Sequence, residues 1–269
     1  MKKFLTLFLV LLFNFSYGKD SLKFAVLSYG NPVEEYKRYK ILADYLSKEA
    51  AVDINIQIVK DINTLFDMFK SNQAQMAVGC SIVYFELKKK YNVEAVAVMK
   101  INGKAVENGV LITKSDSDID KIEQVKGKKI VLGSPICMSN CVMPLYMLTL
   151  AGITQEDVHN IWSAGTDKGA IITLLSSLAD VAGVREESLK GFEDRVKVIA
   201  KSPSFPRHIL MVSKNINPKI YRDIERSLFI LDSQTAEKMG IDGFVKPQSN
   251  MFEVIRKYQQ ILQLFPFVR

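Results

Sequence analysis

Hydrophobic positions along the first hundred residues change their spacing repeatedly, from the period of a strand to that of a helix and back. The clearest strand covers residues 52–59, because every second residue from Val52 to Ile58 is apolar and polar residues lie between them. The segments before and after this strand have apolar residues at helical spacing. We expect strands over residues 22–28, 52–59, 75–79 and 93–101, and helices that open at Asn31-Pro32 and span residues 62–73 and 82–91.

The same alternation returns in the rest of the chain. Expected strands cover residues 109–114, 128–132, 161–164, 181–184, 196–200 and 208–213. Expected helices cover residues 121–125, 138–151, 168–178, 186–192, 218–231, 234–239 and 251–265. This order is typical of an α/β fold in which doubly wound sheets carry helices on both faces and bind ligands at the carboxyl ends of the strands.

No low-complexity linker interrupts the pattern, so the chain has only short extended segments on which to pass between lobes. Such segments occur near residues 104–108 and 202–207, and Pro203 and Pro206 mark the second. We therefore expect two lobes joined by a two-strand hinge. Lobe I comprises residues 19–104 and 208–269, and lobe II comprises residues 105–207.

The first eighteen residues have the pattern of a signal peptide. Lys2 and Lys3 form a short cationic head, and residues 4–15 are almost entirely apolar but too few to span a bilayer comfortably as a helix. Small residues at Ser16 and Gly18 predict cleavage near Gly18, before Lys19. We therefore expect residues 1–18 to be removed and the mature protein to be periplasmic.

Composition narrows the classes of function. The chain has 269 residues, of which 48% are hydrophobic and 24% charged, which is typical of a globular protein and argues against a disordered or fibrous one. Its net charge is +7, or +5 without the two leader lysines, and the charged residues are spread along the chain. This balance gives no reason to expect nucleic acid or an anionic membrane as a partner.

Several stretches resemble one known family. The quoted segments are YKILADYL (residues 39–46), QMAVG (75–79), VKGKKIVLGSP (125–135), LAGI (150–153), KVIAKSP (197–203) and PRH (206–208). They look like parts of the periplasmic binding proteins that deliver phosphate, phosphite and phosphonate to ABC importers, and the third is similar to that family's LKGKRVAFGDP. The resemblance covers roughly residues 22–250. It implies a type II periplasmic binding protein that closes around a small ligand.

The ligand-binding residues that the resemblance implies are partly replaced. Where phosphonate binders present Ser-Thr-Ser at a helix N-terminus, this chain has Cys137, Met138 and Ser139. Where a later family loop often supplies a histidine, this chain has Thr166. The backbone N–H groups of residues 138–141, which include Asn140, still favour an anion, because a helix start leaves them without intrahelical acceptors.

Three cysteines change the chemistry expected at this place. Cys137 and Cys141 are four apart at the opening of one helix, and Cys80 follows a strand whose end should face them from the other lobe. Thiolates bind soft centres such as Cu(I), Zn(II) or trivalent arsenic, and a helix N-terminus lowers a thiol pKa. A related branch of the family senses arsenite. Two other interpretations stay open, namely a Cys137–Cys141 disulfide and plain packing of buried thiols.

Further candidate ligand residues follow the ends of expected strands. Tyr29 and Tyr39 follow the first strand, although Tyr39 also fits the apolar stripe of a helix. Ser81 and Tyr84 follow Cys80 at a strand-to-helix turn. Two residues of the second lobe have alternative roles, because Asp167 also suits a helix cap and Arg185 an ordinary surface charge. Met138 suits either the core or the ligand site.

We therefore expect an exported, monomeric solute-binding protein without a cofactor, which passes its ligand to an inner-membrane ABC permease or a histidine kinase sensor. The ligand is a small oxyanion of the phosphonate, phosphite or phosphate type, or a thiophilic species such as arsenite bound by Cys80, Cys137 and Cys141. We expect no enzyme, because no Gly-rich phosphate loop, Ser-His-Asp set or Cys-His set is present. The alternatives are a thiol-dependent redox protein and a copper- or zinc-binding protein whose metal ligands are these cysteines.

Overall fold

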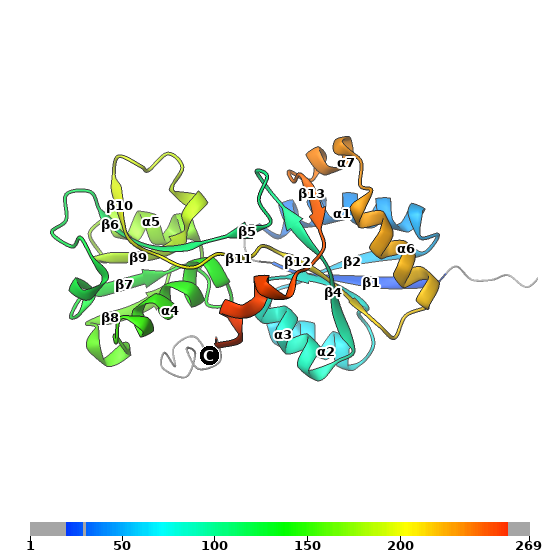
Figure 1. The fold of residues 1–269 in the computed structure, drawn as a ribbon, viewed down its shortest axis with the longest axis horizontal. Coiled ribbons are helices and arrows are strands. Elements are labelled where there is room, and N and C mark those ends of the chain that lie inside the picture. Colours follow the sequence, from blue (N-terminus) through cyan, green and yellow to red (C-terminus); the bar gives the residue numbers. More distant parts are fainter. Residues whose placement is uncertain (1–19, 29–30, 258–269) are drawn as a thin grey trace, which may run out of the picture.

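The computed structural model describes residues 20–28 and 31–257, which fold into two lobes lying end to end (Figure 1). The expected leader, Tyr29 and the last part of the helix expected over residues 251–265 lie outside the described residues. Each lobe contains its own sheet, and a separate pair of very short strands lies between the two sheets. The expected α/β fold with two lobes is confirmed.

Lobe I is built on a six-stranded sheet. In spatial order its strands are β13 (Gly243–Val245), β4 (Val93–Lys100), β12 (Ile209–Ser213), β3 (Met76–Gly79), β1 (Ser21–Leu27) and β2 (Asp53–Val59). β1 is parallel to β2 and β3, whereas β12 is antiparallel to both of its neighbours, β3 and β4. The chain therefore leaves lobe I after β4 and, on its return, enters the sheet as β12.

Helices cover both faces of this sheet because successive strand residues point to opposite sides. On β1, Phe24 and Val26 pack in one core cluster, while Ala25 and Leu27 pack in another. The first cluster is closed by α1 (Pro32–Glu49), α6 (Pro218–Phe229) and α7 (Ser233–Lys238), and the second by α2 (Ile62–Lys70) and α3 (Ser81–Lys90).

Lobe II is built on a five-stranded sheet. In spatial order its strands are β10 (Val196–Lys201), β6 (Gly109–Lys114), β9 (Val181–Arg185), β7 (Lys129–Leu132) and β8 (Asn160–Ser163). One face packs on α4 (Met143–Leu150) and the other on α5 (Asp167–Leu175). The parallel strands β9, β7 and β8 thus have their carboxyl ends together, next to the start of the segment that leads into α4.

Several expected helices differ in type or length. The helix expected over residues 138–151 divides into a π-helix, η2 (Met138–Val142), followed by α4. Short 3-10 helices form at η1 (Ile122–Val125), η3 (Gln155–Asp157) and η4 (Glu186–Leu189), and η4 replaces a longer expected helix. The segment η5 (Ser249–Lys257) is also a 3-10 helix. β13 was not expected, because three residues are too few to show a strand period.

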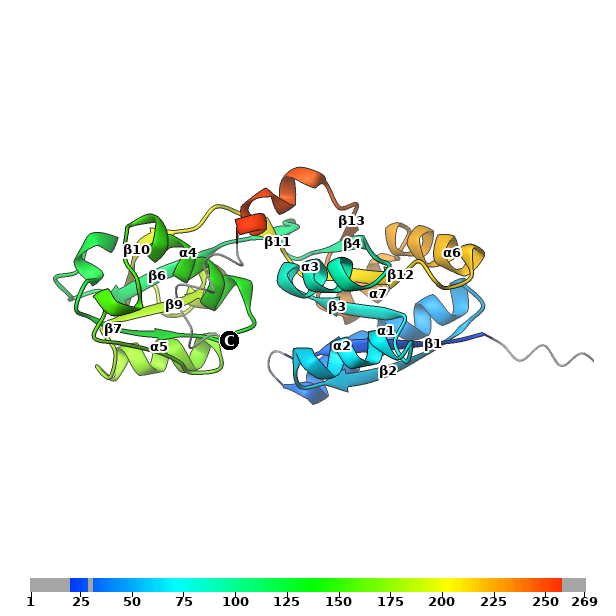
Figure 2. The ribbon, with the colours of Figure 1, turned by 90° about the horizontal axis from the view of Figure 1, so that it is seen from below.

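Two crossing segments join the lobes, and they pair with each other as β5 (Val106–Glu107) and β11 (Phe205–Pro206). Phe205 is fully buried and belongs to a core cluster that contains residues of both lobes. The turned view shows η5, the orange-red helix, lying over this crossing between the lobes (Figure 2), and η5 contacts both β11 and α3. Among the described residues, no helix combines the length and apolarity needed to cross a bilayer.

We expect Phe24→Ala to lower the free energy of unfolding by about 3–5 kcal/mol, because Phe24 is fully buried and its ring meets Tyr39 edge-on at 5.9 Å. Urea unfolding measures this loss. Ile230→Ala in the same lobe is the control, since Ile230 is 60% exposed and its truncation should change stability by less than about 0.5 kcal/mol. Equal losses for the two variants would contradict the assignment of the core.

Candidate functional site

The start of the segment that leads into α4 is a π-turn. The N–H of Val142 donates to the carbonyl of Cys137 at 3.2 Å, and the N–H of Met143 donates to the carbonyl of Met138, so each ring spans five residues. The N–H groups of residues 138–141 come before Val142, the first residue whose N–H bonds within the helix, and so have no acceptor in it. Single π-turns of this kind occur frequently at functional sites.

Two glycines allow this turn to lie close against lobe II. A Cβ on Gly109, the first residue of β6, would lie 2.3 Å from the carbonyl oxygen of Ser139. A Cβ on Gly133, which follows β7, would meet the side chain of Asn140 at 2.1 Å. Any larger residue at either position would push the π-turn away from the sheet.

Arg185, at the carboxyl end of β9, reaches the π-turn with its guanidinium. Its Nε donates to the Oγ of Ser139 at 3.2 Å, and the same nitrogen lies 3.0 Å from Oε2 of Glu107 in an ion pair. Neither terminal nitrogen of Arg185 has a hydrogen-bond partner among the described residues, and the side chain is 28% exposed. A partly exposed cation and a hydroxyl thus lie together at a helix start, which is an arrangement that suits an anion.

Glu107 connects this cation to the crossing strands. It lies on β5, is 9% exposed, and also accepts from Nη1 of Arg207 at 3.3 Å. Arg207 directly follows β11 and donates from Nε to the carbonyl of Lys104 at 3.0 Å and from Nη2 to the carboxylate of Glu187. One buried carboxylate therefore joins two arginines, one from lobe II and one from the return crossing.

Burial and charge oppose each other in this network. Burial raises the pKa of Glu107, and the guanidinium groups of Arg185 and Arg207 act in the opposite direction. Burial alone would lower the pKa of Arg185, but Glu107, Cys137, Asp167 and Glu187 together outweigh burial and leave that pKa raised. Arg185 is therefore a permanent cation.

The three cysteines are all buried, and none of them forms a disulfide. Cys80 precedes α3 in lobe I, and its Sγ donates to the carbonyl of Ile136 in lobe II at 3.3 Å, so the lobes touch here. The Sγ of Cys137 lies 3.3 Å from the Oγ of Ser139. Cys141 is fully buried in the core of lobe II. The Cys137–Cys141 disulfide considered for the sequence is not formed.

The structure corrects the expected thiol chemistry. Burial raises the pKa of Cys137 to about 11, with the Arg185 cation opposing it, and burial also raises the pKa of Cys141. Desolvation therefore outweighs the helix start that was expected to lower these values. No group of three or more His, Cys, Asp or Glu residues in the described part of the chain is placed to hold a metal ion. The three sulfur atoms have different surroundings, because Cys80 faces a carbonyl oxygen and Cys141 lies in the core.

Two buried polar atoms near the lobe contact lack partners. The Oγ of Ser81, the first residue of α3, is fully buried, and Oδ1 of Asn140 lies in the π-turn on a residue that is 4% exposed. Neither atom has a hydrogen-bond partner among the described residues. Such groups are costly to leave unpaired, and they occur here on the two segments that begin at Cys80 and Cys137.

Tyr39 pairs with a histidine that the sequence did not single out. Its hydroxyl lies 3.4 Å from Nδ1 of His208, the residue before β12. Burial lowers the pKa of His208 to about 3, and the nearby cations of Arg185, Arg38 and Arg207 lower it further, so this imidazole is neutral at physiological pH. Burial also raises the pKa of Tyr39, which keeps its proton.

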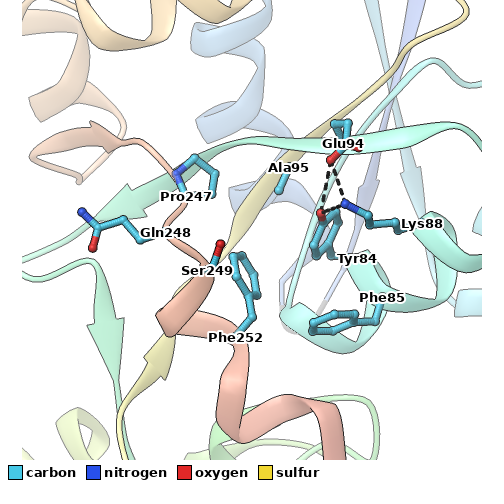
Figure 3. A pocket seen from close by; sticks show the side chains of 9 residues that line it. All are labelled: Tyr84, Phe85, Lys88, Glu94, Ala95, Pro247, Gln248, Ser249 and Phe252. Atoms are coloured by element: carbon cyan, nitrogen blue, oxygen red, sulfur yellow. Dashed lines mark hydrogen bonds and ion pairs between the residues drawn. The ribbon is translucent and has the colours of Figure 1, made fainter.

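Tyr84 points to a different place. Its hydroxyl meets Lys88 at 3.1 Å and Glu94 at 3.4 Å, and Figure 3 shows these side chains on one side of a pocket between α3, β4 and the segment leading into η5. The pocket encloses about 370 Å³ and its far side is formed by Phe252 and neighbouring residues. Tyr84 therefore lies in a second pocket and not at the contact between the lobes.

The remaining expected residues have structural partners. Thr166 caps α5 by accepting from the N–H of Gly169 at 3.0 Å. The helix cap is therefore Thr166 and not Asp167, for which a cap was expected. Asp167 instead accepts from the backbone N–H of Arg185 at 2.7 Å and so fixes the end of β9. Met138 is 1% exposed and packs in the core.

The sequence analysis missed Glu107, Arg207 and His208. The one available signal was their position, because all three lie in or beside the two crossing segments. Nothing in the spacing of residues so far apart along the chain indicates that Glu107 contacts both Arg185 and Arg207.

The sequence and the fold agree with a known family. A sequence model of the family described as "ABC transporter, phosphonate, periplasmic substrate-binding protein" matches residues 24–252. XAC2383 from Xanthomonas citri, solved with chloride, is 15% identical, with a TM-score of 0.78 over 93% of this chain and 98% of its own. PhnD1 from Prochlorococcus marinus, solved with methylphosphonate, is 15% identical, with a TM-score of 0.76 over 91% and 99%. A phosphonate transporter component, PA3383 from Pseudomonas aeruginosa, is 16% identical, with a TM-score of 0.74 over 91% and 87%.

The fold is that of the two-lobed type II periplasmic binding proteins, which capture a small molecule for a transporter. The chain belongs to the periplasmic substrate-binding proteins of phosphonate ABC transporters.

We expect Gly109→Ala to weaken anion binding and to lower stability by about 1–3 kcal/mol, because the added methyl group must displace the carbonyl of Ser139. Thermal unfolding and calorimetric titration with inorganic phosphate measure the two effects. A variant with unchanged stability would show that the π-turn does not rest on β6 as described.

The buried His208 should make stability depend on pH in a defined direction. Its folded pKa of about 3 lies below the ordinary value of 6.5, so below pH 6.5 the unfolded chain binds a proton that the folded chain excludes. Its contribution to the free energy of unfolding should therefore fall by up to about 1.4 kcal/mol per pH unit between pH 6.5 and 3. Denaturant unfolding from pH 7 to 4 should give a shallower loss for His208→Gln than for the parent protein. Identical pH profiles would contradict this assignment.

Proposed function

We propose that this protein captures a small oxyanion of the phosphonate, phosphite or phosphate type between its two lobes and delivers it to an inner-membrane ABC permease. In this proposal lobe I comprises residues 19–104 and 208–269, lobe II comprises residues 105–207, and the leader directs export and is removed near Gly18.

The observation that carries the proposal is the environment of Arg185. Its two terminal nitrogens have no partner within residues 20–28 and 31–257, while its Nε is held beside the Ser139 hydroxyl. The N–H groups of residues 138–141 begin a helical segment at the same place. A guanidinium, a hydroxyl and free amides are the donors that tetrahedral oxyanions accept most strongly.

Closure of the lobes completes the proposed site. The thiol of Cys80 in lobe I meets the carbonyl of Ile136 in lobe II, so the start of α3 lies near the π-turn. The unpartnered Oγ of Ser81 supplies a further hydroxyl from lobe I. An anion held by both lobes favours the closed arrangement, and a permease that recognises that arrangement receives only loaded protein.

A thiophilic ligand is a second candidate, favoured by the approach of Cys80 to the residue before Cys137. Neutral arsenite, As(OH)₃, reacts with neutral thiols, so the raised pKa of Cys137 does not oppose it. Each new As–S bond replaces an As–O bond, and the thiol proton leaves in a water molecule. Soft-metal binding and disulfide exchange receive less support, because both need thiolates. A sensor kinase in place of the permease would use the same ligand site.

We expect Arg185→Gln to raise the Kd for the anion that binds the parent protein by roughly tenfold or more, since a charge-assisted bidentate contact is lost. Thermal-shift screening and calorimetry against methylphosphonate, phosphite, inorganic phosphate and arsenite identify that ligand. Arg195→Gln is the charge-matched control, because Arg195 is an exposed residue of the same lobe and should leave Kd unchanged.

The combined Cys80→Ser, Cys137→Ser and Cys141→Ser variant separates the two candidates. An oxyanion site should retain binding with hydroxyl groups, whereas arsenite binding should be lost. Failure of all three oxyanions to shift the unfolding temperature of the parent protein would refute the oxyanion proposal.

A further inference from the structure

The buried carboxylate of Glu107 has a place in the fold that the capture of a ligand does not by itself explain. Glu107 lies on the outgoing crossing strand, where it is the register partner of Phe205 on the return strand. Its Oε2 forms an ion pair with Arg185 of lobe II and accepts a hydrogen bond from Arg207 at the return crossing. A single oxygen atom thus links both crossings to the cation of the proposed ligand site.

The contact on Arg185 is made through Nε alone. That edge of the guanidinium is shared between Glu107 at 3.0 Å and Ser139 at 3.2 Å, and the two terminal nitrogens have no partner in the part of the chain that the structure describes. Because a guanidinium is planar and rigid, fixing one edge also fixes the direction of the opposite donors. Glu107 therefore determines where the free donors of Arg185 point.

The other end of the network is anchored in the hinge. Arg207 is 4% exposed, and its backbone N–H and its Nε donate to the carbonyls of Ala105 and Lys104, both at 3.0 Å. A change in the angle between the crossing strands would therefore move the carboxylate on which Arg185 rests. In the same way, a ligand that moves Arg185 would alter its contact with Glu107 and, through Glu107, the contact with Arg207 at the hinge.

We propose that Glu107 is a positioning residue, which aims the terminal nitrogens of Arg185 at the bound anion and couples that contact to the hinge. This inference rests on the proposed oxyanion function. It predicts a change in anion affinity opposite in direction to the one that charge alone would cause. Removing a negative charge beside an anion site should strengthen anion binding by Coulomb's law, whereas loss of positioning should weaken it.

The test is Glu107→Gln, titrated by calorimetry with methylphosphonate, phosphite and inorganic phosphate. We expect the Kd of the anion that binds the parent protein to rise about tenfold, as for loss of a charge-assisted contact. Glu187→Gln is the matched control. Glu187 is the other carboxylate that contacts Arg207; its side chain is 39% exposed and makes no hydrogen bond to Arg185. Its replacement should change Kd less than about twofold. Tighter or unchanged binding in Glu107→Gln would overturn the proposal.

Glu107→Asp provides a second variant if Glu107→Gln does not fold, because it keeps the buried charge but is one methylene too short to reach both arginines. We expect its Kd to lie between those of the parent and a tenfold increase, and a parent-like Kd would count against positioning.

Small-angle scattering of the ligand-free proteins tests the hinge coupling separately. The radius of gyration should be larger for Glu107→Gln than for the parent and for Glu187→Gln, and an unchanged value would overturn the coupling. If the parent protein binds none of the three anions, the proposed function fails and the aiming role of Glu107 fails with it, whereas the scattering result still decides the hinge coupling.

Discussion

The ion pairs of one buried carboxylate constrain how the two lobes of this protein fit together. Glu107 is almost completely removed from water, and an ionised carboxylate in such a place needs cationic partners. Arg185 and Arg207 supply them from distant parts of the sequence, one at the end of β9 and one just after β11. The positions of the lobe II sheet, the outgoing crossing and the return crossing are therefore linked by the same short set of contacts.

The alternation of hydrophobic spacing was sufficient to predict the architecture. Strict alternation at residues 52–59 identified β2, and the apolar runs at 75–79 and 181–184 identified buried strands. A strand covered on both faces of a sheet is almost continuously hydrophobic, so it can be recognised in the sequence. The type of a short helix did not follow from the sequence. A 3-10 turn such as η4, or the π-turn before α4, differs from an α-helix only in which carbonyl each N–H selects, and packing against the sheet makes that selection.

The candidate site was predicted in its parts but not in its connections. Ser139 was identified from the family resemblance and Arg185 from its position at the end of a strand, yet their contact depends on how β9 lies beside the π-turn. The sequence also did not predict the pKa of Cys137. A thiol at a helix start is expected to have a lowered pKa, whereas burial of Cys137 raises it. Tyr84 shows a third reason, since a residue in the first turn of a helix that follows a strand can still point toward a neighbouring strand, here Glu94 on β4.

The π-turn also affects how this chain is matched to its relatives. A ring that spans five residues holds one residue more than a ring of an α-helix, so side chains beyond Val142 are rotated about the axis by roughly 100° relative to an uninterrupted α-helix. In an ungapped alignment from Cys137 with a relative that has an uninterrupted α-helix here, Pro144 and its neighbours would be assigned to the wrong face of α4. Such a pair of chains needs a one-residue insertion at the turn before equivalent positions are compared.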